Sequence, residues 1–235
     1  MKVVSILAHA DDEMRCLGTM LRCRERGDAL AFVTVTDGCK GFVQNPNTAR
    51  EEAAAIRESE LRAIADDLGA EMFNLGELDE FTYDTPDARM NLIEVVRRTK
   101  ADLIFTHAPE DYNLDHTTVS SLVRHCAMQS CLPVLPTESR PLAAHPAIFI
   151  VEPHGPFAFT PTHYVDVSTV DAEKVRLLSH HRSQERAIRK ALGTGLGDLS
   201  ARLSAFRGGQ VGCEHAEAFV PMPARGAIKP FSVLP

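Results

Sequence analysis

Four ionisable side chains stand within five positions, directly after the first apolar run of the chain. The segment LAHADDEM (7–14) contains His9, Asp11, Asp12 and Glu13. Like charges at such close spacing repel one another unless a positive charge lies among them. A bound cation is one explanation. The other is an ordinary helix start, where one aspartate caps the first turn and suits the helix dipole. Because a cap needs only one carboxylate, the cluster as a whole favours a metal site.

A second histidine motif, THAPEDYNLDH (106–116), follows a later apolar run. Asp115 has the position of an N-cap and His116 that of the first helical turn, where a lone histidine is often only a solvated surface residue. Zinc binds imidazole and carboxylate groups, and catalytic zinc sites keep three protein ligands and one open position. His9, Asp12 and His116 therefore predict an open site for a divalent transition ion. Asp11 would then point toward the water in the open position.

The elements that must position these residues alternate between strand and helix. Ligands of open parallel sheets bind beyond the carboxyl ends of the strands, so both motifs are expected at one edge of the sheet. The pattern predicts an α/β fold: a three-layer, Rossmann-like open sheet, mostly parallel, with helices on both faces, and a single domain over 1–235. The expected strands are 3–7, 29–38, 71–78, 101–107, 146–153 and 163–168; the expected helices are one around 17–26, then 49–68, one opening at 85–86, 116–127, one from 171 toward 184, and 200–206.

Composition narrows the class of protein. Hydrophobic residues make up 44% of the 235 residues and charged residues 24%, as in ordinary soluble proteins. A net charge of -7 argues against nucleic-acid binding, which needs clustered lysine and arginine. No apolar stretch approaches the roughly 20 residues that cross a bilayer, and the first residues are too short for a secretory signal, so we expect a cytoplasmic protein without membrane insertion. The six cysteines form no CxxC pair and are expected to be thiols.

The two motifs resemble those of a known family. LAHADDE is similar to the AHPDDE signature of the PIG-L/LmbE-like zinc-dependent de-N-acetylases, and DYNLDH is similar to the family's second metal motif. The resemblance continues over nearly the whole chain, from about Val3 to Phe219. It includes an R-x-x-E helix, an acidic residue after the third strand, HRSQ (181–184) near the C-terminal helix and AEAF (216–219) in the final strand.

The resemblance implies a role for each matching residue. His9, Asp12 and His116 would bind Zn2+, and Asp11 would be the general base. Asn113 stands where many members have a histidine that stabilises the oxyanion together with the aspartate of the following Asp-His pair, here Asp115. An asparagine amide can donate a hydrogen bond to an oxyanion but cannot supply a proton. Ala10 replaces the usual proline, which loosens the turn without removing any chemistry.

The contacts to substrate leave alternatives open. Arg57 could bind a sugar hydroxyl or an anionic group, or form an ion pair with Glu60 one turn further on. Asp79 could bind hydroxyls or merely end a strand. The leading hypothesis is a zinc-dependent hydrolase that removes an N-acetyl group from a small amino-sugar-containing molecule. The alternatives are an amidase acting on a non-sugar N-acyl substrate, and a metal-binding module without turnover. The partner would be the small-molecule N-acetylated substrate, and the family resemblance suggests a homo-oligomer.

Overall fold

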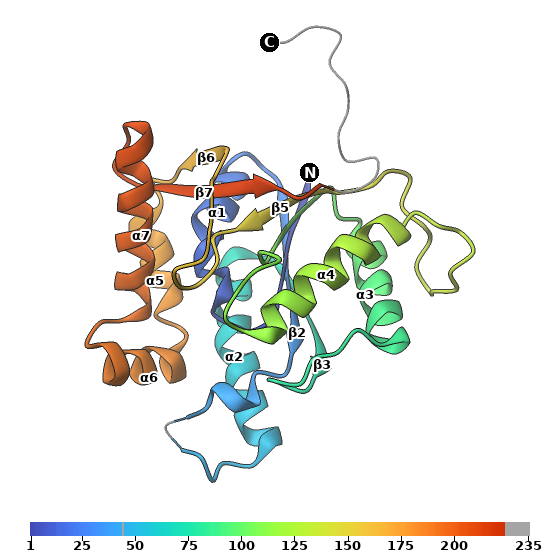
Figure 1. Ribbon diagram of the computed structural model, residues 1–235, viewed down its shortest axis with the longest axis horizontal. Coiled ribbons are helices and arrows are strands. Elements are labelled where there is room, and N and C mark those ends of the chain that lie inside the picture. Colours follow the sequence, from blue (N-terminus) through green and yellow to red (C-terminus); the bar gives the residue numbers. More distant parts are fainter. Residues whose placement is uncertain (44, 224–235) are drawn as a thin grey trace, which may run out of the picture.

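The computed structural model describes residues 1–43 and 45–223, and its centre is one seven-stranded sheet with the order β3-β2-β1-β4-β5-β7-β6 (Figure 1). The strands are β1 (Lys2–Leu7), β2 (Ala29–Thr36), β3 (Glu71–Glu77), β4 (Leu103–Thr106), β5 (Ala147–Val151), β6 (His163–Asp166) and β7 (Ala216–Pro221). The helices are α1 (Leu17–Glu25), α2 (Arg50–Leu68), α3 (Pro86–Thr99), α4 (Leu114–Gln129), α5 (Asp171–Leu178), α6 (Arg182–Leu192) and α7 (Leu196–Val211), with short 3-10 turns at Asp12–Arg15 and Cys39–Gly41.

The first five strands of the chain form the parallel part of the sheet, as predicted. β1 pairs in parallel with β2 on one side and with β4 on the other, β2 pairs with β3, and β4 pairs with β5. Successive side chains of a strand point to opposite faces of the sheet, and β1 has apolar side chains on both faces. Val3 and Leu7 enter one core, and Val4 and Ile6 enter the other. A strand covered on both faces must lie in the middle of the sheet, and this fixes the position of the loop that follows it.

Two hydrophobic cores make the three layers. One core joins a face of the sheet to α1, α2 and α5, with Leu17, Ile64 and Leu177 among its fully buried side chains. The other joins the opposite face to α3 and α4, through residues such as Leu92 and Leu122. In Figure 1, α3 and α4 lie on one side of the molecule and α5, α6 and α7 on the other. The predicted architecture is confirmed.

The C-terminal part departs from the predicted elements. β7 lies between β5 and β6 and runs antiparallel to both. The single helix expected from 171 toward 184 is wrong, because the chain turns after Leu178 and starts α6 at Arg182. This turn buries the imidazole of His181 completely against the carboxylate of Glu13, a contact that a continuous helix would not make. A buried, paired polar group outweighs local helix propensity here.

The last helix is longer than predicted. α7 extends from Leu196 to Val211 instead of 200–206, and it runs through Gly208 and Gly209. A Cβ atom on Gly208 would lie 2.6 Å from the carbonyl oxygen of Glu214, so glycine is required where the following loop returns past the helix. Glycine therefore marks a close backbone approach at this position and not the end of the helix.

The cysteines and the helices bear on two expectations from the composition. All six cysteines are unpaired thiols, and Cys16, Cys23 and Cys126 are buried. Among residues 1–43 and 45–223, no helix has both the length and the apolar character needed to cross a bilayer.

Candidate metal centre and active site

The two sequence motifs meet at the carboxyl edge of the sheet. His9 and Asp12 follow β1, and His116 lies in the first turn of α4, which follows β4. The chain leaves β1 for its neighbour β2 and later returns to β4 on the other side of β1. This reversal opens a crevice at the strand ends, which is the usual ligand position in open α/β sheets. The predicted convergence of the two motifs is therefore present in the structure.

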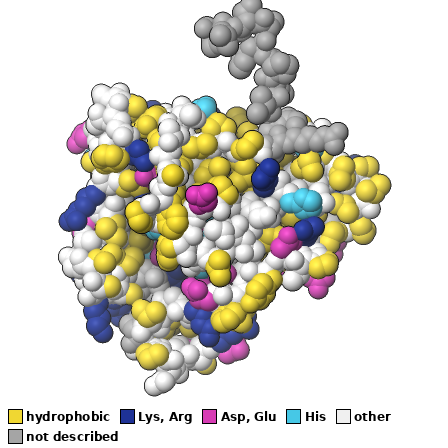
Figure 2. Space-filling model, viewed as in Figure 1, with side chains coloured by type: hydrophobic (Ala, Val, Ile, Leu, Met, Phe, Trp, Pro, Cys, Tyr) yellow, Lys and Arg dark blue, Asp and Glu magenta, His cyan; other side chains and the backbone are white. Residues whose placement is uncertain are grey.

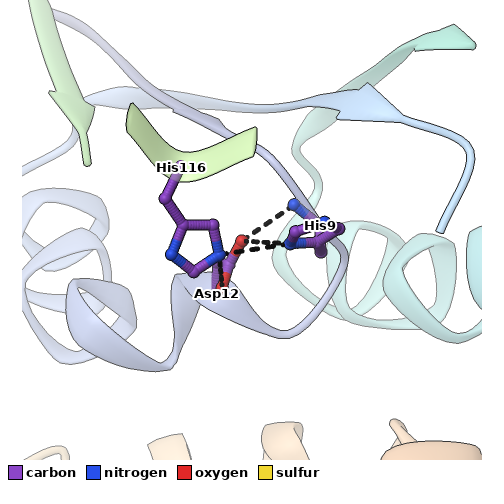
Figure 3. A group of neighbouring side chains, drawn as sticks. All are labelled: His9, Asp12 and His116. Atoms are coloured by element: carbon purple, nitrogen blue, oxygen red, sulfur yellow. Dashed lines mark hydrogen bonds and ion pairs between the residues drawn. The ribbon is translucent and has the colours of Figure 1, made fainter. Parts of the chain in front are cut away.

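The side chains of His9, Asp12 and His116 point toward one another (Figure 3). His9 Nδ1 lies 3.2 Å from His116 Nε2 and 3.3 Å from Asp12 Oδ2. His116 Nε2 lies 3.4 Å from Asp12 Oδ1. Metal–ligand bonds of about 2.0–2.1 Å at tetrahedral angles place neighbouring ligand atoms roughly 3.3–3.4 Å apart. The two inward nitrogens, and each nitrogen with the nearer oxygen of the Asp12 carboxylate, therefore lie at about the spacing that a tetrahedral zinc ion requires.

The outward nitrogens of both rings face carboxylates. His9 Nε2 lies 3.1 Å from Asp79 Oδ1 and 3.3 Å from Asp115 Oδ2, and His116 Nδ1 lies 3.1 Å from Asp111 Oδ1. Carboxylates accept hydrogen bonds, so each ring in its neutral form would carry its proton on the outward nitrogen and direct the lone pair of the inward nitrogen toward the centre of the site. Two lone pairs and a carboxylate facing one another are repulsive unless a cation lies between them. The same carboxylate–histidine arrangement orients zinc ligands in metalloenzymes, so the residues fit a zinc ion.

The electrostatics of the site also favour a cation. Burial alone would lower the pKa of His9, yet Asp115, Asp12 and Asp79 raise that pKa well above its ordinary value. Burial raises the pKa of Asp12, but His116 and His107 more than offset this and leave it well below the usual range. The site therefore favours the ionised form of Asp12 and attracts positive charge.

Asp11 lies beside the three candidate ligands on an unusual backbone. Its φ of 114° falls in a region that non-glycine residues rarely adopt, a conformation that costs about 1–3 kcal/mol and is found mainly at functional sites. The backbone N–H of Asp11 donates to Glu13 Oε2 at 2.9 Å, which holds this turn. Burial raises the pKa of the Asp11 carboxyl, while Arg57 opposes the rise. A carboxylate with a raised pKa that borders a cavity is suited to proton transfer.

Neither aspartate caps the following helix, which was the alternative to a metal site. Asp12 Oδ2 accepts the backbone N–H of His9 at 2.8 Å, within the turn. The first turn of α1 is capped instead by Glu217 of β7, which accepts the N–H groups of Gly18 at 2.9 Å and Thr19 at 2.7 Å. Capping of α1 therefore does not account for Asp11 and Asp12.

Arg57 is buried and bonded to the first motif. Its Nη2 donates to Asp11 Oδ1 at 2.9 Å and to the carbonyl oxygen of Ala10. The alternative ion pair with Glu60 is absent, because Glu60 accepts hydrogen bonds from the backbone and hydroxyl of Ser183 at 2.8 and 2.7 Å. Arg57 borders the cavity, and its Nε and Nη1 atoms are buried without a protein partner.

Asp79, Asn113 and Asp115 have specific partners. Asp79 accepts the backbone N–H groups of Lys40 and Gly41, besides its contact with His9. The N-cap of α4 is Asn113 and not Asp115 as predicted: Asn113 Oδ1 accepts the N–H of Asp115 at 2.7 Å. The amide nitrogen of Asn113 is 3.3 Å from Glu80 Oε1.

Asp115 connects His9 to the loop that follows β3. Besides its contact with His9, it accepts backbone N–H groups from Glu80 at 2.7 Å and Thr82 at 3.0 Å. It is almost fully buried. The position of Asp115 therefore orients His9 and leaves little freedom for a direct contact with substrate.

Two histidines near the site are not among the residues predicted from the sequence. His107, at the end of β4, accepts the N–H of Ala8 at 2.9 Å, and its ring stacks on His116 at 4.0 Å between centroids. Burial lowers the pKa of His107 to about 4, so the ring is neutral. His154 follows β5 and approaches Asp12 Oδ1 to 3.7 Å. Both stand just beyond a strand end, and a search for histidines at every carboxyl strand end would have found them.

A cavity of about 600 Å³ opens in front of the site. His9, Asp12 and His116 border it together with Asp11, and the predicted residues Arg57, Asp79 and Asn113 also line it. Figure 2 shows the surface from the side of Figure 1, where hydrophobic side chains are spread among polar and charged ones. Asp115 is the one predicted site residue that does not border the cavity.

The fold and site define an α/β protein with a His-Asp-His centre at the carboxyl edge of a mostly parallel sheet. Residues 4–127 match the sequence model of the PIG-L family, described as GlcNAc-PI de-N-acetylase. This match covers more than half of the chain, so the protein belongs to the PIG-L family, and the resemblance found in the motifs is confirmed.

Solved structures share the whole fold at low sequence identity. N,N'-diacetylchitobiose deacetylase from Pyrococcus horikoshii is 24% identical with a TM-score of 0.82, covering 94% of this chain and 84% of its own. The 4-carboxy-2-hydroxymuconate hydratase GalB from Pseudomonas putida is 21% identical with a TM-score of 0.83, covering 99% of this chain and 100% of its own. The conserved protein TT1542 from Thermus thermophilus is 24% identical with a TM-score of 0.77, covering 99% and 95%. No curated protein matches the chain.

Proposed function

We propose that this protein is a zinc-dependent hydrolase that removes an N-acetyl or other N-acyl group from a small molecule containing an amino sugar. The observation that carries the proposal is the group of inward-facing atoms of His9, Asp12 and His116, with Asp11 beside it at the same cavity. Membership of the PIG-L family supports removal of an acyl group from an amide nitrogen.

His9, Asp12 and His116 would hold the zinc ion. When bound, zinc polarises an amide carbonyl and lowers the pKa of a water molecule toward about 7. Asp11 accepts the proton of the attacking water through its carboxylate and returns that proton to the leaving amine nitrogen. Arg57 holds Asp11 in position through the 2.9 Å contact with Oδ1. Asp79, Asp111 and Asp115 keep the two imidazole rings in the tautomer that directs lone pairs inward.

Arg57 and Asn113 supply the remaining polar groups. Arg57 borders the cavity, where its positive charge favours substrate hydroxyls or an anionic group. Asn113 donates its amide hydrogen to the oxygen that becomes negative as the carbonyl is attacked, once that hydrogen is released from Glu80. Asp79 supports His9 and the loop at Lys40 and Gly41, so its part in substrate binding is through the shape of that loop.

The direct experiment measures acetate release from several N-acetylamino sugars by the zinc-loaded protein and its Asp11→Asn variant. We expect the substitution to lower the rate by about 100- to 10000-fold while the zinc content stays at one per chain, since general-base catalysis has this size. Asp66→Asn makes the same charge change on an exposed face of α2 and should have no effect. Full activity in Asp11→Asn would show that the base is assigned wrongly.

Two other reactions compete with this one, and each is tested by giving the same zinc-loaded protein its own class of substrate. Release of the acyl group only from non-sugar amides would make the protein an amidase of another class. Hydration of a carbon–carbon double bond is the second candidate, because the hydratase GalB matches the fold over the full length of both chains. Asp11 favours hydrolysis, since an amide leaving group needs a returned proton. Zinc binding without turnover of any of these substrates would leave a metal-binding module.

A further inference from the structure

Part of the cavity wall is apolar and has no role in the reaction described above. Ile188 and Leu192 of α6, Leu196 and Leu199 of α7, and Met14 of the first motif's turn border the same cavity as the metal centre. We call these five side chains the apolar wall. Met14 and Leu196 are buried, whereas Ile188 and Leu199 are partly exposed toward the cavity.

The apolar wall is built by local structure that is already formed. Gln184, Ile188 and Leu192 are spaced four residues apart, so they share one face of α6. The Gln184 amide donates to the carbonyl oxygen of Gly41 at 2.9 Å and turns this face toward the cavity. Glu185 accepts the N–H of Leu196 at 2.7 Å, which holds the turn between α6 and α7. The wall is therefore present before any ligand binds.

Large apolar side chains are also exposed around the cavity mouth. Leu192 is 65% exposed, Val43 64% and Tyr112 67%, and all three border the cavity. Single exposed apolar residues are ordinary, but several around one concave site mark contact with an apolar ligand group. The volume of about 600 Å³ lies in the middle of the range of about 300–1000 Å³ that holds drug-sized ligands, and an acetyl group fills only a small part of it.

We propose that the apolar wall binds an alkyl or aryl group of the substrate, so that the preferred substrates are N-acyl conjugates with an extended apolar substituent. This inference rests on the proposed function, because it places the reacting amide at the metal centre. The apolar group could be attached on either side of that amide, as the aglycone of a glycoside or as a longer acyl chain. Each methylene moved from water onto the wall strengthens binding about threefold to fourfold.

The experiment compares short and long substrates in two matched pairs. Methyl and hexyl N-acetyl-β-glucosaminide vary the aglycone, and N-acetyl- and N-hexanoylglucosamine vary the acyl chain. We expect kcat/KM for the long member of one pair to exceed that of the short member by about 10- to 100-fold, the gain from about two or three methylenes that contact the wall. The pair that shows the gain identifies the side on which the apolar group lies.

A substitution in the wall should reduce this preference. Leu192→Ser places a hydroxyl at the exposed last residue of α6, and we expect it to lower the long-to-short ratio by about threefold to tenfold. Val211→Ser is the matched control, since Val211 is the partly exposed last residue of α7 and does not border the cavity. The control should keep the ratio of the unchanged protein. An equal fall in both variants would contradict the wall assignment.

Calorimetric binding to the zinc-loaded Asp11→Asn variant separates this inference from the proposed function. Tighter binding of the long members without turnover in the unchanged protein supports the apolar wall and overturns the hydrolase. Turnover with equal kcat/KM and equal affinity for short and long members supports the hydrolase and overturns the apolar wall. Binding of neither member of either pair also overturns the wall.

Discussion

The two parts of the chain contribute different things to one cavity. The part from β1 to α4 follows a regular alternation of strand and helix, matches the family model over residues 4–127, and carries His9, Asp12 and His116. The part from β5 to β7 is irregular, contains the antiparallel strand, and supplies most of the apolar wall. In our proposal the reaction depends on the first part, and the second part adds a preference for substrates with an apolar group. Substitutions in the two parts should therefore change different measured quantities.

Removing a metal ligand should have the largest effect. His116→Ala takes one of three ligands from the first part, and we expect zinc content to fall below detection and acetate release to fall by about 1000-fold or more, since the metal contributes several kcal/mol. Metal analysis after dialysis, together with the acetate assay, checks this. His145→Ala removes an exposed histidine outside the cavity and should retain both properties. Undiminished zinc in His116→Ala would contradict the ligand assignment.

An outer carboxylate should have an intermediate effect. Asp115→Asn replaces the group that orients His9 Nε2 and accepts two loop N–H groups. We expect zinc affinity to fall about 10- to 100-fold, because partners of metal-bound histidines contribute that much. Competition with a chelator of known affinity measures the change. An unchanged affinity together with a lower rate would instead place Asp115 in direct contact with the substrate, as the family resemblance implies.

A substitution in the contact between the two parts should have the smallest effect. Ser183→Ala removes the hydroxyl that donates to Glu60 at 2.7 Å and ties α6 to α2. We expect the free energy of unfolding in urea to fall by about 1.5–3 kcal/mol, the usual contribution of a hydrogen bond to a charged group. The long-to-short substrate ratio should fall as well, while zinc content stays at one per chain. Ser59→Ala on the exposed face of α2 is the control and should leave stability unchanged or slightly higher.

Sequence alone predicted most of the first part. The apolar runs and helix-spaced residues of β1 to α4 are local signals, and the strand-end rule then brought His9 and His116 to one edge without any further information. The residue that caps α4 could not be assigned from the sequence, because Asn113 and Asp115 are both good cap residues and stand two positions apart.

Long-range contacts account for what sequence did not predict. Glu217 caps α1 from a strand 199 residues further along the chain, and no local pattern reports such a contact. The break between α5 and α6 depends on His181 meeting Glu13, 168 residues away. The pairing of β7 with both β5 and β6 likewise does not follow from the hydrophobic periodicity of the sequence. These are tertiary effects that override local preference.

Anomalous X-ray diffraction from zinc-loaded crystals, with data collected on both sides of the zinc absorption edge, tests the central claim most directly. The account predicts one strong peak per chain at about 2.0–2.2 Å from His9 Nδ1, one Asp12 carboxylate oxygen and His116 Nε2, with a fourth position open to the cavity. The absence of a peak among these three side chains would contradict the account. A zinc peak at the neighbouring group of Asp37, Cys39 and Asp79 would contradict it as well.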